Sequence, residues 1–162
     1  MEPLTEAQVR ASFVNCSKGE AKRLTVPREL ANHPWDDLDF LGWRDPQSKV
    51  RGYLVAIRDG APYGIVLRAT DGSSGTPRKN LCTLCLTPHG PGGVALLVAP
   101  RAGKAGQNGD SVGTYLCADL QCSSYVRGKR VSDAGRLPES LSTEQRIERL
   151  ATNLATFLAR VG

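Results

Sequence analysis

The chain has 162 residues, and its hydrophobic fraction of 40% and charged fraction of 23% exclude a disordered or fibrous protein. No apolar run approaches the roughly 18 residues of a membrane-spanning helix, and the start MEPLTEAQVR lacks the basic and apolar regions of a signal peptide. We therefore expect one cytoplasmic domain over residues 1–162, monomeric and without membrane contact. The formal net charge of +5 permits an acidic protein, a ribosome or RNA as the partner and requires none of them.

A first amphipathic helix is expected from Thr5 to Cys16, because apolar residues recur there at helical spacing. Thr5 and Gln8 have the spacing of a capping box, which marks a helix start. Cys16 would then share a helical face with Val9 and Phe13, where a cysteine acts as a small buried hydrophobic residue.

The stretch from Pro27 to Pro46 mixes prolines, acids and aromatic residues without a clear period, so we expect irregular chain with one short helical turn. Its carboxylates Asp36, Asp37 and Asp39 raise the alternative of a general acid and base. Adjacent acids ahead of an apolar pair more often form a solvated helix start, where they interact favourably with the helix dipole, and we favour that interpretation.

The middle of the chain is rich in strand formers. The runs RGYLVAIR (51–58) and YGIVLR (63–68) flank Asp59-Gly60, which supplies turn chemistry, so together they predict a β-hairpin. The run DGSSGTP (71–77) is a loop by composition. A third apolar run, GVALLVAP (93–100), predicts a further strand.

Residues 101–113, RAGKAGQNGDSVG, are expected to form a mobile glycine-rich loop. The pair Gly103-Lys104 opens this segment and does not close a phosphate-binding motif ahead of a helix, so that motif is excluded. A partner-binding loop that carries Arg101 and Lys104 is the alternative. The following TYLC (114–117) predicts a short strand.

The end of the chain predicts a long amphipathic helix over about residues 142–161. Ser142 and Gln145 form a capping box ahead of it. An apolar stripe continues for four turns, so this helix should pack against the rest of the domain. Its members are Ile147, Leu150, Ala151, Leu154, Phe157, Leu158 and Val161.

Four of the five cysteines form two close pairs, Cys82-x₂-Cys85 and Cys117-x₄-Cys122. A reducing cytosol disfavours disulfides, and zinc favours ligands held in tight local turns at bonds of about 2.3 Å. We therefore predict one structural Zn²⁺ bound by these four thiolates, which would lower the net charge to about +3. The alternative, four buried or redox-active thiols of the thioredoxin type, does not explain the second pair.

The sequence around the two pairs fits a treble-clef zinc finger within residues 79–130. LCTLCLT would form a knuckle at a hairpin, and CADLQCSSYV would place the second pair at the start of a helix, where free amides stabilise a thiolate. His89 lies close enough in sequence to replace a thiolate, but four cysteines already complete the shell, so we expect an exposed loop histidine. With only two histidines, both in loop-like sequence, we expect no enzyme.

A basic segment follows the second cysteine pair and consists of Tyr125, Arg127, Lys129 and Arg130. Two interpretations remain open for it. The residues could be a solvated face that balances the anionic zinc–thiolate centre, or a contact surface for another macromolecule.

Three segments carry a resemblance to a known family: FVNCSKGEAKR, LCTLCLT and VAPRAGKAGQNGDSVGTYLCADLQCSSYVRGKR. The pattern resembles the treble-clef zinc-finger domain of the elongation factor G-binding proteins, the fusidic-acid-resistance family. It spans roughly Thr5 to Arg130 and is most specific from Cys82 onward. The four cysteines match the family's metal ligands position for position.

The resemblance implies a non-enzymatic translation accessory protein that binds elongation factor G and helps it leave the ribosome, leaving the antibiotic unmodified. The family's resistance proteins carry a helical domain ahead of the finger-bearing part, whereas this chain reaches its hairpin by Arg51. We therefore expect an α+β protein with a small antiparallel sheet, a four-cysteine treble-clef finger and a packing C-terminal helix. A zinc module that binds ribosomal or other RNA through its basic segment is the alternative.

Overall fold

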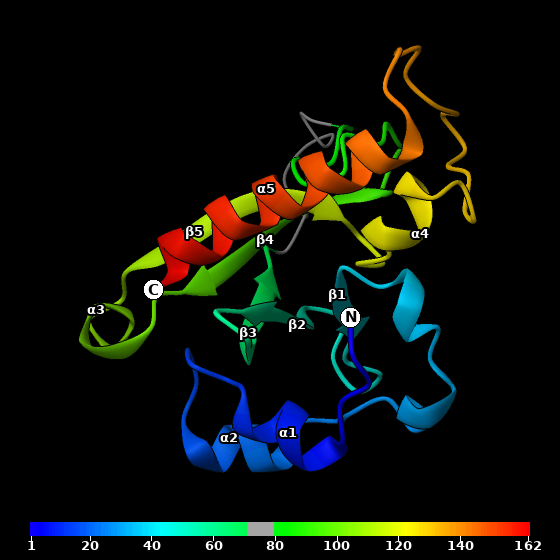
Figure 1. Cartoon of the computed structure of the whole chain (residues 1–162). Coiled ribbons are helices and arrows are strands. Elements are labelled where there is room, and N and C mark those ends of the chain that lie inside the picture. The colour runs from blue at the N-terminus through cyan, green and yellow to red at the C-terminus, as the bar shows by residue number, and fades with distance from the viewer. Residues whose placement is uncertain (71–79) are drawn as a thin grey trace.

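The computed structural model describes residues 1–70 and 80–162. Over these residues the chain forms a five-stranded antiparallel sheet in which each strand pairs with the next along the chain (Figure 1). The strands are β1 (Phe40–Arg44), β2 (Arg51–Arg58), β3 (Ala61–Ala69), β4 (Val94–Pro100) and β5 (Ser111–Cys117). The helices are α1 (Glu6–Ala11), α2 (Lys18–Arg23), α3 (Gly103–Gln107), α4 (Cys122–Val126) and α5 (Thr143–Val161), with short 3₁₀ turns η1 (Leu30–Asn32) and η2 (Trp35–Asp37). The predicted α+β class is confirmed.

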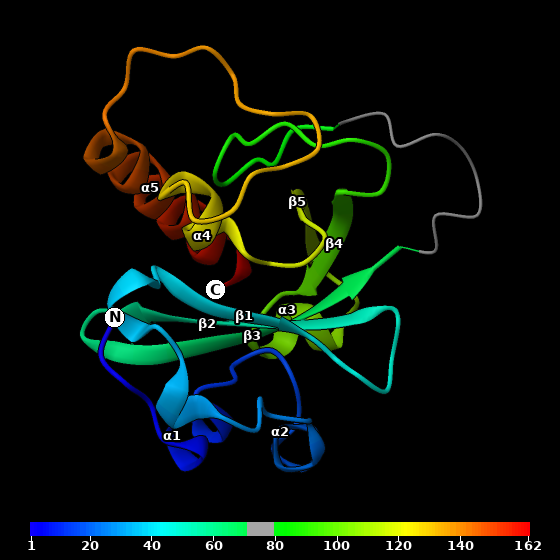
Figure 2. The same cartoon turned by 90° about the vertical axis from the view of Figure 1, so that its right-hand side faces the viewer.

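Helices cover both faces of the β1–β3 part of the sheet: α4 and α5 lie on one side, and α1 and α2 lie on the other (Figures 1 and 2). Side chains alternate between the two faces of a strand. In β2, Leu54 and Ala56 join the core beneath α5, whereas Tyr53 and Val55 join the core beneath α1 and α2. Because both faces are covered, five consecutive residues of β2 are buried.

The hairpin predicted around Asp59-Gly60 is confirmed. β2 and β3 pair as far as Arg58 and Ala61, which leaves two residues in the turn. Their φ angles are 51° and 77°, the positive values that a type I′ turn requires. Glycine adopts such a backbone freely and aspartate tolerates it, so the local sequence alone specifies this turn.

The C-terminal helix is also confirmed as α5, and the capping box of Ser142 and Gln145 is formed. One face of the helix is buried in the core on its side of the sheet. No helix in the described part of the chain is both long enough and apolar enough to cross a membrane. The buried residues of α5 are Leu150, Leu154, Phe157, Leu158 and Val161. Of the other two residues in the predicted stripe, Ile147 is partly buried and Ala151 is exposed, so including Ala151 was wrong.

Two expectations about irregular chain were wrong. The stretch from Pro27 to Pro46 contains β1, whose apolar residues Phe40 to Trp43 are all buried by pairing with β2 and by packing on both faces. The segment 101–113 contains the short helix α3 and the first residues of β5. In both places tertiary packing overrides a composition typical of loops. The expected loop at 71–77 lies outside the described residues.

The first helix is shorter than expected. Its capping box at Thr5 is confirmed, but α1 ends at Ala11, and Cys16 lies beyond it, partly buried against the core beneath α1 and α2. The chain leaves the helix because it pairs with β3: the Gly64 amide donates to the Ser12 carbonyl at 2.9 Å, and the Val14 amide donates to the Gly64 carbonyl at 3.0 Å. Placing Cys16 on the helical face was therefore wrong.

The side chain of Asn15 joins two strands that separate from each other. β3 and β4 pair only at their Arg68–Val98 and Ala69–Leu97 positions. Beyond that point the side-chain oxygen of Asn15 accepts a hydrogen bond from the Val66 backbone amide at 2.7 Å. The side-chain nitrogen of Asn15 donates to the Val66 and Pro100 carbonyls, each at 3.0 Å. Asn15 thus satisfies three backbone groups that no neighbouring strand reaches.

We expect Asn15→Ala to lower the free energy of unfolding by about 2–4 kcal/mol, because three hydrogen bonds of about 1 kcal/mol each are lost and partly buried backbone groups are left unpaired. Urea unfolding followed by circular dichroism would measure the change. Asn32→Ala removes the same side chain at an exposed position and serves as the control. Equal stability of the two variants would show that Asn15 does not hold the strands together.

Candidate metal centre

The first cysteine pair lies in a closed knuckle. The His89 amide donates to the Asn80 carbonyl at 2.7 Å and closes the loop. Within it, the Leu86 amide donates to the Cys82 carbonyl at 3.0 Å, and Leu86 has a φ angle of 54°. This tight turn brings the side chains of Cys82 and Cys85 to the same side, as a two-residue spacing between zinc ligands requires.

The second pair joins a strand to a helix. Cys117 is the last residue of β5, and Cys122 is the first residue of α4. Between them the Leu120 amide donates to the Cys117 carbonyl at 2.9 Å, and the Asp119 carboxylate accepts from the Gln121 amide at 3.0 Å. This arrangement is the strand-to-helix turn predicted from CADLQC.

The four sulfur atoms converge. All four lie within 4.8 Å of one another, and two of the contacts, Cys85 to Cys117 and Cys82 to Cys122, measure 3.4 and 3.7 Å between the Sγ atoms. A regular tetrahedron with Zn–S bonds of about 2.3 Å has edges of about 3.8 Å, so the spacing is close to what zinc requires. The cysteines are at most 4% exposed, which suits a closed structural site.

Zinc would resolve an electrostatic conflict among these thiols. When no metal is bound, hydrogen bonds from Cys117 and Cys122 hold the pKa of Cys82 well below its usual range. Hydrogen bonding to Cys117 and Cys82, together with burial, raises the pKa of Cys122 well above it. Four thiolates therefore cannot coexist there without a cation, and a zinc ion replaces the protons that keep the cluster neutral.

The C-terminal helix supports the knuckle directly. The Asn153 side chain of α5 donates to the Leu84 carbonyl at 2.9 Å. Leu84 lies between the two knuckle cysteines in sequence and is 1% exposed in the core that also contains Leu150. The four cysteines and α5 are thus parts of one packed unit, and a bound zinc ion would stabilise a core that extends beyond the finger.

His89 is not the exposed loop residue that the sequence predicted. It is 3% exposed, its Nε2 atom lies 3.2 Å from the Cys117 Sγ atom, and its ring meets the Tyr125 ring edge to face at 4.9 Å. It lies beside the cluster of four sulfurs and is not one of the grouped ligands. Sequence spacing gave no sign of this because Cys117 lies 28 residues away.

The basic segment, Tyr125, Arg127, Lys129 and Arg130, packs against carboxylates. Arg127 holds Asp39 with two hydrogen bonds of 2.5 and 3.1 Å, and these side chains are only 14% and 11% exposed. Lys129 pairs with Asp37, and Arg130 pairs with Asp119 at 2.6 Å. The hydroxyl of Tyr125 also donates to Asp119 at 2.9 Å. Two of the acids considered as a catalytic pair, Asp37 and Asp39, are therefore partners of this segment.

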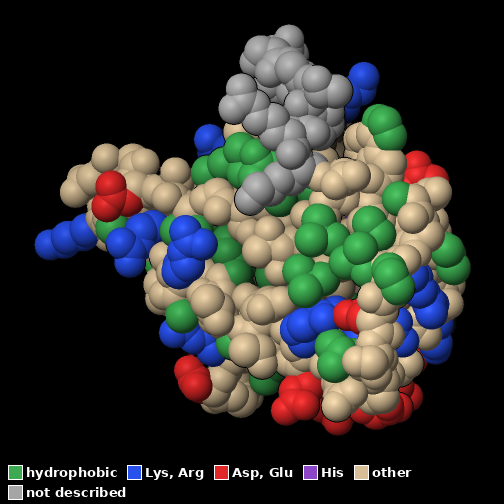
Figure 3. Space-filling view, turned by 90° about the horizontal axis from the view of Figure 1, so that it is seen from above, with side chains coloured by type: hydrophobic (Ala, Val, Ile, Leu, Met, Phe, Trp, Pro, Cys, Tyr) green, Lys and Arg blue, Asp and Glu red, His purple; other side chains and the backbone are tan. Residues whose placement is uncertain are grey.

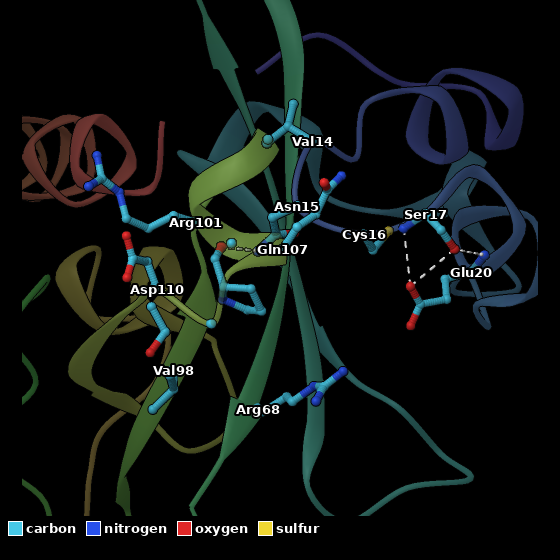
Figure 4. A pocket seen from close by; sticks show the side chains of 15 residues that line it. Val14, Asn15, Cys16, Ser17, Glu20, Arg68, Val98, Arg101, Gln107 and Asp110 are labelled. Carbon is cyan, nitrogen blue, oxygen red and sulfur yellow. Dashed lines mark hydrogen bonds between the residues drawn. The ribbon is translucent and has the colours of Figure 1, made fainter.

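Arg101 and Lys104 lie between the two cysteine pairs in the sequence, but they follow the Pro100 end of β4, whereas the Val94 end pairs with Cys117. Arg101 lines a cleft of about 660 Å³ between the segment after α1 and the segment around α3. Figure 4 shows this cleft, with Cys16 and Ser17 on one side and Arg101 and Asp110 on the other. Lys104 is an exposed residue of α3.

A knuckle that carries one cysteine pair and a strand-to-helix turn that carries the other define a treble-clef zinc finger, with four buried cysteines suited to one structural zinc ion. The chain belongs to the FBP C-terminal treble-clef zinc-finger family, whose model matches residues 8–161.

Among solved structures, the chain is similar to the fusidic acid resistance protein FusC, with a TM-score of 0.59 and 18% sequence identity. The match covers 100% of this chain and 60% of the FusC chain. At this identity the likeness shows a shared fold. A comparison with curated proteins gave no match.

Proposed function

We propose that this protein is a non-enzymatic accessory factor of translation that binds elongation factor G in the cytoplasm and promotes its release from the ribosome. The observation that carries the proposal is the family match over residues 8–161, which includes both cysteine pairs, the sheet and α5. Similarity in fold to a protein described as a fusidic acid resistance protein supports it. The chain spans 60% of the length of that protein. Binding to elongation factor G is therefore the central part of the proposal, and release from the ribosome would follow from it.

The proposed contact surface is the basic segment, and Arg101 and Lys104, beyond the opposite end of β4, would form a separate second contact. Its members differ in what they can offer a partner. Lys129 and Arg130 have side chains that are 56% and 52% exposed. Arg127 is held by Asp39 and Tyr125 by Asp119, so these two residues orient the surface, and the exposed pair would contact the partner.

Exposed apolar residues lie directly after the basic segment. Val131 is 67% exposed and Leu137 is 43% exposed, and both line a shallow hollow together with Leu86, Arg130 and Arg136. Figure 3 shows such a combination on one face, where hydrophobic side chains gather beside Lys and Arg side chains. Exposed apolar side chains beside arginines suit a protein-binding surface, in which arginine is enriched.

The ion pairs favour a protein partner over RNA. Arg127, Lys129 and Arg130 each have a carboxylate of this chain as a partner, so the segment carries little uncompensated positive charge. Binding to phosphates requires such charge, because its affinity comes from the release of counterions. A protein surface with hydrogen-bonding and apolar groups matches the segment and its apolar neighbours better.

The test is calorimetry of the zinc-loaded chain against purified elongation factor G without RNA. We expect the double variant Lys129→Ala, Arg130→Ala to bind about tenfold more weakly, or about 1.4 kcal/mol, because two exposed contacts are lost. The matched control is Lys22→Ala, Arg23→Ala, which removes two exposed charges from α2 on the other side of the sheet and should leave affinity unchanged.

Equal affinities of both double variants would remove the basic segment from the interface. Undetectable binding by the unmutated chain would overturn the function itself. Binding to isolated ribosomal RNA that weakens steeply with salt would instead support the RNA-binding alternative.

A further inference from the structure

His89 occupies a space that the fold keeps open for its imidazole ring. A Cβ atom at Gly93 would lie 2.5 Å from the His89 Cβ and 2.9 Å from its ring, so only glycine fits there. On another side, the Tyr125 ring meets the imidazole at an interplanar angle of 87°. The backbone amide of His89 closes the knuckle through Asn80. The ring is therefore fixed in position and orientation.

The fixed ring directs its Nε2 atom at one ligand of the metal, the Cys117 sulfur, at 3.2 Å. We propose that His89 is a positioning residue of the zinc centre, which donates its Nε2–H to the zinc-bound thiolate of Cys117. A thiolate bound to zinc has no proton to donate, so a hydrogen bond at this distance needs the donor on the imidazole. Zinc binding would thus select the tautomer that carries hydrogen on Nε2.

Hydrogen bonds connect the residue that packs on His89 to the turn that carries the second cysteine pair. Tyr125, which packs on the imidazole, donates its hydroxyl to Asp119 at 2.9 Å. The same carboxylate accepts from the Gln121 amide within the turn between Cys117 and Cys122. His89, Tyr125 and Asp119 therefore link the end of the knuckle to the turn that carries the other two ligands.

The consequence of the hydrogen bond is a less basic and less nucleophilic sulfur. It withdraws electron density from the Cys117 thiolate and spreads part of the charge of an anionic four-thiolate centre. In zinc sites such partners of the ligands raise metal affinity by about 10–100-fold. We expect His89 to slow zinc loss and thiolate oxidation in the same way.

Three variants test the proposal in the zinc-loaded full chain. His89→Phe keeps a ring of similar shape and removes the donor, and it should weaken zinc affinity by about 10–100-fold in competition with a chromophoric chelator. His89→Gln restores an N–H donor and should recover most of that loss. The control is His33→Phe, which changes the chain's other histidine, located in the segment between η1 and η2.

Spectroscopy separates a hydrogen bond from a packing role. In the cobalt-substituted protein, the thiolate-to-cobalt charge-transfer band should move to longer wavelength in His89→Phe and return in His89→Gln, because a sulfur without its hydrogen bond is easier to oxidise. A packing role would not move the band. Unchanged affinity and an unchanged band in His89→Phe would overturn the proposal.

Nitrogen-15 NMR of the unmutated, zinc-loaded protein decides the question if His89→Phe does not fold. We expect the Nε2 atom of His89 to carry a hydrogen that is shared with the Cys117 sulfur. An Nε2 atom without hydrogen would contradict the proposal, and coupling between Nε2 and cadmium-113 in the cadmium-loaded protein would identify His89 as a ligand and overturn it too. Neither measurement depends on elongation factor binding.

Discussion

We expect the Cys85→Ser variant to bind no zinc and to fold incompletely. Zinc binding contributes on the order of 10 kcal/mol or more to the folding of finger peptides, whereas a whole domain is stable by only about 5–15 kcal/mol. The loss would reach beyond the finger, because the cysteines belong to the same core as α5. Metal analysis should return well below one zinc per chain, and near-ultraviolet circular dichroism should lose its signal.

The control for this experiment is Cys16→Ser. It makes the same chemical change at a partly buried cysteine outside the cluster of four sulfurs. Burial raises the pKa of the Cys16 thiol, so this residue should neither bind zinc nor react readily. The expected result is one zinc per chain and an intact fold. A well-folded Cys85→Ser protein, or substoichiometric zinc in the unmutated protein, would refute the structural zinc site.

Leu150→Asp should lower the free energy of unfolding by about 4 kcal/mol or more. Leu150 is fully buried on α5. Removing a buried leucine side chain costs about 2–5 kcal/mol, and burying a carboxylate without a partner adds to that loss. Thermal or urea unfolding of the zinc-loaded protein would measure the effect.

The neighbouring residue supplies the control, because Ala151→Asp introduces the same carboxylate on the exposed side of the helix. We expect a change within about 0.5 kcal/mol for it. Similar stabilities of the two variants would mean that α5 does not dock on the sheet in solution, and its apolar stripe would then be a surface for another chain.

Local sequence rules account for the features predicted correctly. A capping box needs residues three positions apart, a two-residue turn needs neighbours with positive φ, and a zinc knuckle needs cysteines two residues apart. Each is complete within a few residues of chain. The helix starts at Thr5 and Ser142, the turn at Asp59-Gly60 and the pairs of cysteines could therefore be predicted without the fold.

The features missed depend on partners that are distant in sequence. β1 became a strand by pairing with β2 and by burial between two cores, although prolines and acids surround it. The first helix ends early because residues 12 and 14 pair with Gly64 of β3. Nothing in the local pattern records those partners, and tertiary packing outweighs propensities that span only about 1 kcal/mol.

The sequence by itself determined which four residues form the zinc centre, since sulfur chemistry and spacing are local properties. Only the tertiary structure decided what surrounds that centre. It placed His89 beside Cys117, joined Arg127 to Asp39 across 88 residues, and joined Asn15 to Pro100 across 85. Hydrogen bonds and ion pairs act over a few ångströms in space, and only folding brings such residues within that distance.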